Sequence, residues 1–152
     1  PNPVTVLAVK DARSMTSIIP LAADRFVIRP PAKYMFHRGT YGIESLDEEV
    51  ETEDLQRRKA NEIMLRLYGN RLKEQGKFSG YSEQRIKNLL KETIRDKINV
   101  YLDADEAVTW GFADGIYSGD YDNLRITKVN LERRRRNNAV LRKPVKIKVD
   151  VK

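Results

Sequence analysis

Short apolar runs alternate with longer amphipathic stretches along this chain. Residues 4–9, 25–28 and 33–36 are runs rich in β-branched, aromatic and other apolar side chains, each bounded by charged or turn residues. Runs of this length are typical of buried strands. Between the first two, residues 14–23 have a helix-like composition that Pro20 interrupts, because proline lacks the N–H that a helix interior needs. The pattern predicts three strands and a short, broken helix in the first 36 residues.

Two longer stretches have the period of an amphipathic helix. A long helix is predicted from about Leu46 to Glu74, with Gly76 as its stop. A second helix is predicted over Glu83–Lys97, capped by Ser82. The apolar positions that support these two helices are Leu55, Ile63, Leu65, Leu67, Tyr68 and Leu72 in the first, and Ile86, Leu89, Leu90 and Ile94 in the second.

A third, shorter helix is predicted after Asp103. Glu106 lies three residues beyond Asp103, which is the spacing of a capping box, and Gly111 is placed to end the helix in a left-handed conformation. Trp110, in the last turn, is expected in the core or at an interface. The alternation of strands and helices predicts an α/β domain.

Length and composition limit the class of protein. The chain has 152 residues, which suits one domain, and it has no cysteine. The lack of cysteine excludes disulfides and any cysteine-based metal site or nucleophile, and it is compatible with the cytoplasmic location that we expect. No apolar run reaches the roughly 18–20 residues that span a bilayer, and no segment resembles a signal peptide, so we expect no membrane partner.

The net charge of +7 lies in the last part of the chain. Residues 118–152 hold eleven Lys and Arg against four Asp and Glu, whereas residues 1–117 hold eighteen of each sign. Four consecutive arginines occupy 133–136, and residues 144–152 alternate apolar and polar side chains as a half-exposed strand does. No interleaved aromatic residues or nucleic-acid motif accompany the arginines, so docking or assembly is favoured over nucleic-acid binding. We therefore divide the chain into a domain at 1–117 and a basic C-terminal extension at 118–152.

Ser14 and His37 form the candidate catalytic pair. Ser14 lies where an apolar strand gives way to a helix, so its hydroxyl is expected at the positive end of the helix dipole, where the charge of acyl transfer is stabilised. His37 is the single histidine of the chain. Histidine is the side-chain type whose ordinary pKa suits a general base near neutral pH. A lone histidine on an apolar strand is more often a packed residue, so this pair alone leaves catalysis open.

Four short motifs follow one another along the chain, and together they strengthen the case for catalysis. They are ARSM at residues 12–15, LAA at 21–23, YMFH at 34–37, and a late segment at 102–116 that contains E-A-x-x-x-G. In this order and spacing they resemble the ClpP family, the proteolytic subunits of Clp protease within the crotonase-like superfamily, over roughly residues 4–117. The resemblance implies a fold of repeated β-β-α units with a long handle helix. It also implies a serine endopeptidase that hydrolyses peptide bonds of unfolded proteins.

The resemblance assigns roles to individual positions. Ser14 matches the nucleophile, His37 the general base, and Met15 the residue whose backbone N–H helps to bind the oxyanion. Asn99 occupies the third triad position, where the family usually has Asp, and Asp96 is a rival three residues earlier. Asparagine accepts a hydrogen bond from the imidazole but does not stabilise an imidazolium by charge.

The family's substrate groove follows the histidine, which here corresponds to Gly39, Thr40, Tyr41 and Gly42. The family also has about half of its fold before the serine, including a Gly-rich strand that completes the oxyanion hole. Only thirteen residues precede Ser14 here. We therefore expect that the N-terminal part of the fold is missing, either because the chain is the C-terminal piece of a split or processed protease or because another chain supplies it.

The resemblance further implies partners and no cofactor. Expected are homo- or hetero-oligomers built as stacked seven-membered rings, a polypeptide substrate and an AAA+ unfoldase, with no metal or organic cofactor. The chain has no nucleotide-binding motif, so ATP hydrolysis would belong to the partner.

Two alternative functions stay open. Asn99, and Val100 where the family commonly has Arg, suggest a weakened or inactive structural subunit, and the late motif alone fits a crotonase-type acyl-CoA enzyme.

Overall fold

The computed structural model describes residues 2–39 and 47–132, with the backbone alone described for residues 47–51. The predicted groove residues Thr40, Tyr41 and Gly42 lie outside the described residues, as do the arginine run at 133–136 and the alternating segment at 144–152.

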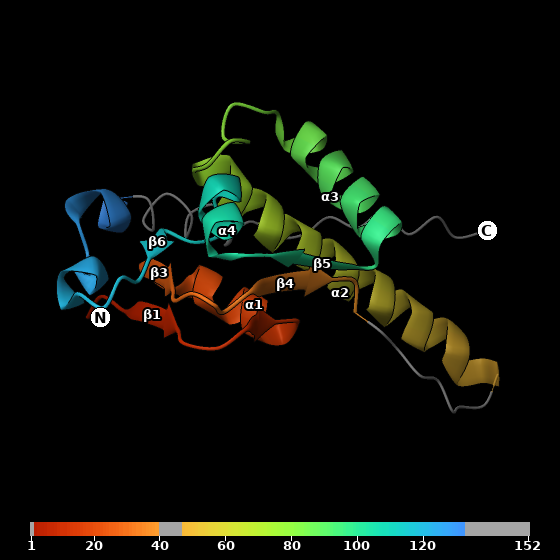
Figure 1. Cartoon of the computed structure of the whole chain (residues 1–152). Helices are drawn as coiled ribbons and strands as arrows, with labels where there is room; N and C mark the ends of the chain where they lie inside the picture. The colour runs from red at the N-terminus through yellow and green to blue at the C-terminus, as the bar shows by residue number, and fades with distance from the viewer. Residues whose placement is uncertain (1, 40–46, 133–152) are drawn as a thin grey trace.

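The architecture is mixed α/β, as predicted (Figure 1). Its elements are β1 Thr5–Ala8, β2 Ala12–Arg13, α1 Met15–Ile18, the 3-10 helix η1 Ile19–Ala22, β3 Arg25–Ile28, β4 Tyr34–His37, α2 Asp47–Glu74, α3 Glu83–Lys97, β5 Asn99–Leu102, α4 Ala104–Trp110, β6 Gly115–Ile116 and the 3-10 helix η2 Tyr121–Leu124.

The strands form two small sheets, and the first four strands alternate between them along the chain. The first sheet has the order β1-β3-β6 and is parallel throughout, whereas the second has the order β2-β4-β5, with β2 parallel and β5 antiparallel to β4. After β1 the chain crosses to the second sheet as β2, and after β3 it crosses again as β4. This repeated path is what sets β2 beside β4, because each follows a strand of the first sheet by only a few residues.

The long helix α2 provides one wall of the core. Its buried apolar positions are Met64, Leu65, Tyr68 and Leu72, which lie on one face of the helix and belong to a cluster that includes Phe36 of β4. Ile63, which the sequence pattern assigned to the apolar face, is 41% exposed. The N-terminal turns of α2 extend past the end of β4, and α3 lies alongside the helix (Figure 1). The core therefore uses the C-terminal half of α2.

The first predicted helix is shorter than the sequence suggested. α1 is a single turn, and η1 continues from it with Pro20 in its first turn. A proline at the start of a helical turn supplies a suitable φ but removes an N–H, so the α-helical ladder ends at that point. One turn carries little dipole, so the helix dipole that we expected to favour Ser14 contributes little.

The other helix boundaries agree with the sequence. Oγ of Ser82 accepts a hydrogen bond from the N–H of Arg85 at 3.2 Å. The capping box of α4 is complete, because Oδ1 of Asp103 accepts from the Glu106 N–H at 2.8 Å and Oε2 of Glu106 accepts from the Asp103 N–H at 3.0 Å. Trp110 is half-buried against the core, where its ring lies 5.1 Å from that of Phe78.

Two glycines join the ends of α2 and α4. Gly76 and Gly111 have φ of +79° and +104°, which side-chain-bearing residues rarely adopt. A Cβ on Gly76 would lie 2.4 Å from the carbonyl oxygen of Trp110, and one on Gly111 would lie 2.2 Å from that of Gln75. The two backbones therefore touch, and this contact fixes the late motif against the end of the long helix.

A buried ion pair ties α2 to β6 and β3. Nη2 of Arg71 donates to Oδ2 of Asp114 at 2.7 Å, and its Nε donates to the carbonyl of Phe112 at 3.0 Å. Oδ2 of Asp114 also accepts from the N–H of Phe26 at 2.7 Å.

Among the described residues, no helix is both long and apolar enough to cross a bilayer.

The start of the predicted basic extension packs against the first sheet. The carbonyl of Leu124 in η2 accepts from the Thr5 hydroxyl at 2.8 Å, and that of Asn123 accepts from Nε of Arg25 at 2.7 Å. Residues 121–124 therefore contact β1 and β3.

Candidate active site

Ser14 occupies a sharp turn between β2 and α1. Its φ of 52° and ψ of −121° lie in a region that residues other than glycine rarely adopt, at a cost of about 1–3 kcal/mol. The neighbouring strand holds one side of this turn, because the Ser14 N–H donates to the carbonyl of Met35 at 3.1 Å. The side chain of Ser14 is exposed to solvent. A strained turn of this kind presents the hydroxyl outward from the end of the strand.

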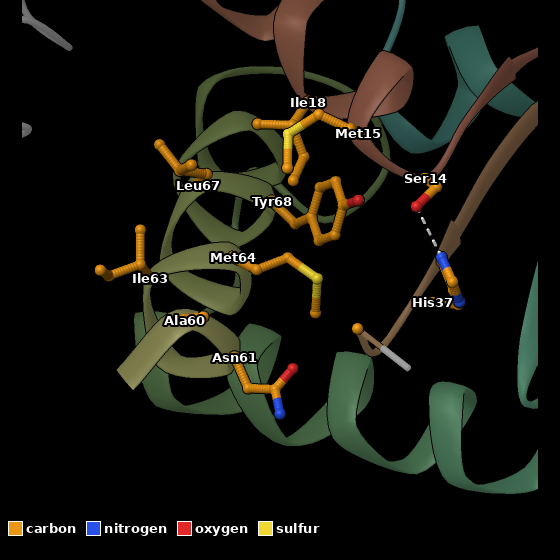
Figure 2. Close-up of a pocket in the computed structure, with 11 residues that line it drawn as sticks. Ser14, Met15, Ile18, His37, Ala60, Asn61, Ile63, Met64, Leu67 and Tyr68 are labelled. Carbon is orange, nitrogen blue, oxygen red and sulfur yellow. Dashed lines mark hydrogen bonds between the residues drawn. The ribbon is translucent and has the colours of Figure 1, made fainter. Parts of the chain in front are cut away.

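The parallel pairing of β2 with β4 brings His37 to the serine. Ala12 pairs with Tyr34 and Arg13 with Met35. Parallel strands end at the same edge of a sheet, so the residue after β2 and the last residue of β4 lie together. Nε2 of His37 lies 2.8 Å from Oγ of Ser14, although 23 positions separate them in the sequence (Figure 2).

This contact has the geometry of a nucleophile and its base. A distance of 2.8 Å is within hydrogen-bond reach, which proton transfer between the two atoms requires. When the Ser14 hydroxyl donates to Nε2, the neutral ring carries its proton on Nδ1. The two residues that the sequence singled out are thus brought together in the orientation that activation of the serine needs.

Asn99 lies next to the pair, on the third strand of the same sheet. It is the residue directly opposite His37 in the antiparallel pairing of β5 with β4. Opposite residues point to the same face of a sheet, with their Cβ atoms roughly 5 Å apart. Within the described part of the chain, no hydrogen bond joins the Asn99 side chain to the His37 ring. The rival Asp96 is exposed near the end of α3, where its carboxylate accepts from Arg95 at 3.1 Å.

The Met15 N–H lies beside Ser14. Met15 is the first residue of α1, and its N–H takes part in no hydrogen bond among residues 2–39 and 47–132. The side chain of Met15 is 65% exposed. A free backbone N–H on the residue after the serine can donate to an oxyanion that forms on a substrate carbonyl.

A cavity of about 400 Å³ opens beside the Ser14–His37 pair (Figure 2). Its far wall is the middle of α2, and most of its side chains are apolar. It is lined by Ser14, Met15, Ile18, His37, Gly39, Ala60, Asn61, Ile63, Met64, Leu67 and Tyr68. Of the four groove residues expected from the sequence, Gly39 lines this cavity.

Sequence reasoning missed the contribution of α2 to this cavity. Ile63 and Leu67 were interpreted only as apolar positions of the long helix, and Ala60 and Met64 were left unassigned, yet all four line a space that the serine faces. One signal was present. The apolar stripe of α2 is wider than a single packed face, with Ile63 and Leu67 one turn apart beside Met64 and Tyr68.

Charged side chains precede the turn at Ser14. The Asp11 carboxylate accepts the Lys33 N–H at 2.7 Å and Nε of Arg13 at 2.9 Å. The backbone hydrogen bond from Lys33 and then the contact with Arg13 lower the pKa of Asp11. The Arg13 guanidinium also lies over the ring of Tyr101, 5.5 Å from its centroid. These contacts anchor β2 just before Ser14.

The described residues contain no group of three or more His, Cys, Asp or Glu side chains that could hold a metal ion.

Comparison with known families places the chain beside proteases. The family model described as Clp protease matches residues 1–120, which include both sheets and all the candidate catalytic residues. No curated protein matches the sequence.

Proposed function

The chain belongs to the Clp protease family, and we propose that it is a serine endopeptidase subunit in which Ser14 is the nucleophile and His37 the general base. The observation that carries this proposal is the 2.8 Å contact between Oγ of Ser14 and Nε2 of His37. The strained backbone of Ser14 supports it, because such strain is retained at sites where the side chain must be held in one direction.

The chemistry proceeds through an acyl-enzyme. Oγ of Ser14 attacks the carbonyl carbon of a peptide bond while its proton passes to Nε2 of His37. The oxyanion that forms accepts a hydrogen bond from the Met15 N–H. Collapse of the tetrahedral intermediate breaks the C–N bond, and the leaving amine takes the proton from His37. Water then attacks the ester, giving its proton to His37, and Ser14 recovers its proton as the acid product leaves.

Asn99 is proposed to orient the imidazole. From its position opposite His37, its side-chain oxygen accepts the Nδ1–H of the ring when the substrate-bound site tightens. An amide supplies this hydrogen bond without a negative charge, so the imidazolium formed during attack is stabilised less than by a carboxylate. The proposed enzyme is therefore slower than one with Asp at this position.

The substrate is proposed to be an extended polypeptide with an apolar side chain beside the cleaved bond. Such a side chain fits the cavity next to Ser14, whose α2 wall contributes Ala60, Ile63, Met64 and Leu67. The family membership supports assembly into stacked rings and delivery of unfolded chains by an ATP-driven unfoldase as further parts of the proposal.

Labelling with a fluorophosphonate tests the proposal. The native assembly, its integrity checked by size, is treated with the probe, and the adduct is read by intact mass. We expect one adduct per chain, absent in Ser14→Ala and retained in Ser79→Ala, which removes an exposed serine hydroxyl bonded to the Gly76 carbonyl. No adduct on an intact assembly would overturn the proposal and favour a structural subunit.

A further inference from the structure

The backbone of Ser14 is strained, so other groups must hold it in place. Its carbonyl oxygen accepts two hydrogen bonds from the same residue, one from the Ser17 N–H at 3.0 Å and one from the Ser17 hydroxyl at 2.6 Å. Ser17 is fully buried, although it belongs to the single turn that follows the exposed nucleophile. A buried hydroxyl on a carbonyl helps to fix the position of that carbonyl, because a hydroxyl in a dry environment keeps its hydrogen-bond acceptor.

The direction of the Ser17 hydroxyl bond shows that Tyr68 is a third residue in the chain of bonds that holds Ser14. A serine hydroxyl has one proton, and in Ser17 this proton goes to the Ser14 carbonyl, which can only accept. Oγ of Ser17 also lies 2.8 Å from the Tyr68 hydroxyl. Because the Ser17 proton is already used, the Tyr68 hydroxyl must be the donor in this contact. The chain of bonds therefore runs from Tyr68 of α2 through Ser17 to the carbonyl of the nucleophile.

Tyr68 is a rigid support for this chain of bonds. Its side chain is fully buried, and its ring packs 5.4 Å from that of Phe36 and 5.7 Å from that of Phe112. Phe36 is the residue before His37 on β4. Tyr68 thus contacts the turn of Ser14 through its hydroxyl and the strand of His37 through its ring. One side chain of α2 therefore connects the segments that carry Ser14 and His37.

We propose that Tyr68 and Ser17 are positioning residues for the nucleophile, which hold the Ser14 turn so that its hydroxyl stays directed at His37 and the Met15 N–H stays directed at the oxyanion. The proposal rests on the role of Ser14 as nucleophile. Neither residue touches the reacting atoms. Burial raises the pKa of Tyr68 to about 12, so its hydroxyl stays protonated and remains a donor at the working pH of the site.

Tyr34 provides a matched control. Its hydroxyl is buried like that of Tyr68 and donates to the backbone carbonyl of Ser17 at 2.8 Å. This bond does not reach Ser14. Tyr34→Phe and Tyr68→Phe therefore remove the same atom from the same core and cost similar stability, but only Tyr68→Phe breaks the chain of bonds that ends on the nucleophile.

The experiment measures the rate constant of fluorophosphonate labelling at Ser14 in the native assembly, well below the melting temperature of each variant. We expect Tyr68→Phe and Ser17→Ala to slow labelling by about 10- to 100-fold, because small misplacements of a reacting group cost rates of this order. Tyr34→Phe is expected to slow labelling much less than Tyr68→Phe, because its bond fixes the Ser17 backbone and not the hydroxyl that bonds the Ser14 carbonyl. With a peptide substrate, Tyr68→Phe should lower kcat while KM stays the same, since the ring that lines the cavity is retained.

The double variant Tyr68→Phe/Ser17→Ala tests whether the two hydroxyls act through one path. We expect it to be no slower than Ser17→Ala, because both changes interrupt the same chain. Labelling of folded Tyr68→Phe and Ser17→Ala within about twofold of wild type would overturn the inference, as would an equal loss in Tyr34→Phe. If wild type itself is not labelled, the proposed function fails instead, so the two failures are distinguishable.

Discussion

Asn99 is the residue paired with His37 where β5 runs antiparallel to β4. Ser14 lies on the other side of His37, beyond the parallel strand β2, at 2.8 Å from its ring. The three candidate triad residues therefore lie on, or directly after, three adjacent strands of one small sheet. This arrangement allows a direct test of the position at which the chain departs from its family.

The charge at position 99 is expected to control the reactivity of Ser14. Asn99→Asp should raise the labelling rate by about tenfold or more, because a carboxylate beside the ring stabilises the imidazolium. Asn99→Ala should lower the rate, since the ring then loses a hydrogen-bond acceptor. Fluorophosphonate kinetics on the three proteins measures both effects. Equal rates in all three would show that position 99 plays no part in orienting His37.

The contact between Gly76 and Gly111 is expected to tolerate no side chain. Gly76→Ala and Gly111→Ala each combine a positive φ with a Cβ less than 3 Å from a backbone carbonyl oxygen. Each should lower the free energy of unfolding by about 2–4 kcal/mol. Gly80→Ala is the control, because a Cβ there meets nothing within 4 Å. Urea unfolding of the three variants checks the prediction, which a small loss at position 76 or 111 would contradict.

Arg71 is expected to be essential for stability. Arg71→Met leaves the Asp114 carboxylate buried without its guanidinium, and such a loss costs about 3–5 kcal/mol. Arg58→Met is the matched control, because Arg58 pairs with Asp54 on the exposed surface of the same helix. An exposed pair contributes about 0–1 kcal/mol. Similar melting temperatures for the two variants would contradict this expectation.

Asp11 should make stability depend on acidity. The Lys33 N–H and the Arg13 side chain lower its pKa in the folded state. A lowered folded-state pKa gives a contribution that is present at neutral pH and is lost as the pH falls through that value. Asp11→Asn should therefore be slightly less stable than wild type at about pH 7, and the difference should be smaller at about pH 2. Urea midpoints at both pH values measure this difference, and a constant difference would contradict it.

The cavity wall is expected to set substrate preference. Leu67→Lys places a charge where an apolar side chain of the substrate would bind, so KM for apolar peptides should rise by about tenfold or more. Labelling of Ser14 by a small fluorophosphonate should persist, because the probe does not need the cavity. Loss of both Ser14 labelling and peptide turnover would instead indicate damage to the fold.

Much of the local structure follows from residues close together in the chain. The strand at Arg25–Ile28 and the helix at Glu83–Lys97 have the bounds that the sequence predicts. The capping box of Asp103 and Glu106 and the left-handed Gly111 were also predicted correctly. These features depend on hydrogen bonds and side-chain patterns within a few residues, so the sequence carries them directly.

The sequence by itself determined the family and the identity of the Ser14 and His37 candidates, because motifs and a single histidine are readable without coordinates. Only the tertiary structure decided that β2 and β4 run side by side and so bring these residues within 2.8 Å. It also decided that α2 lines the adjoining cavity and that Tyr68 supports Ser14 through Ser17. Contacts of this kind join residues 23 to 51 positions apart, and no local pattern specifies them, because they depend on how separate elements pack.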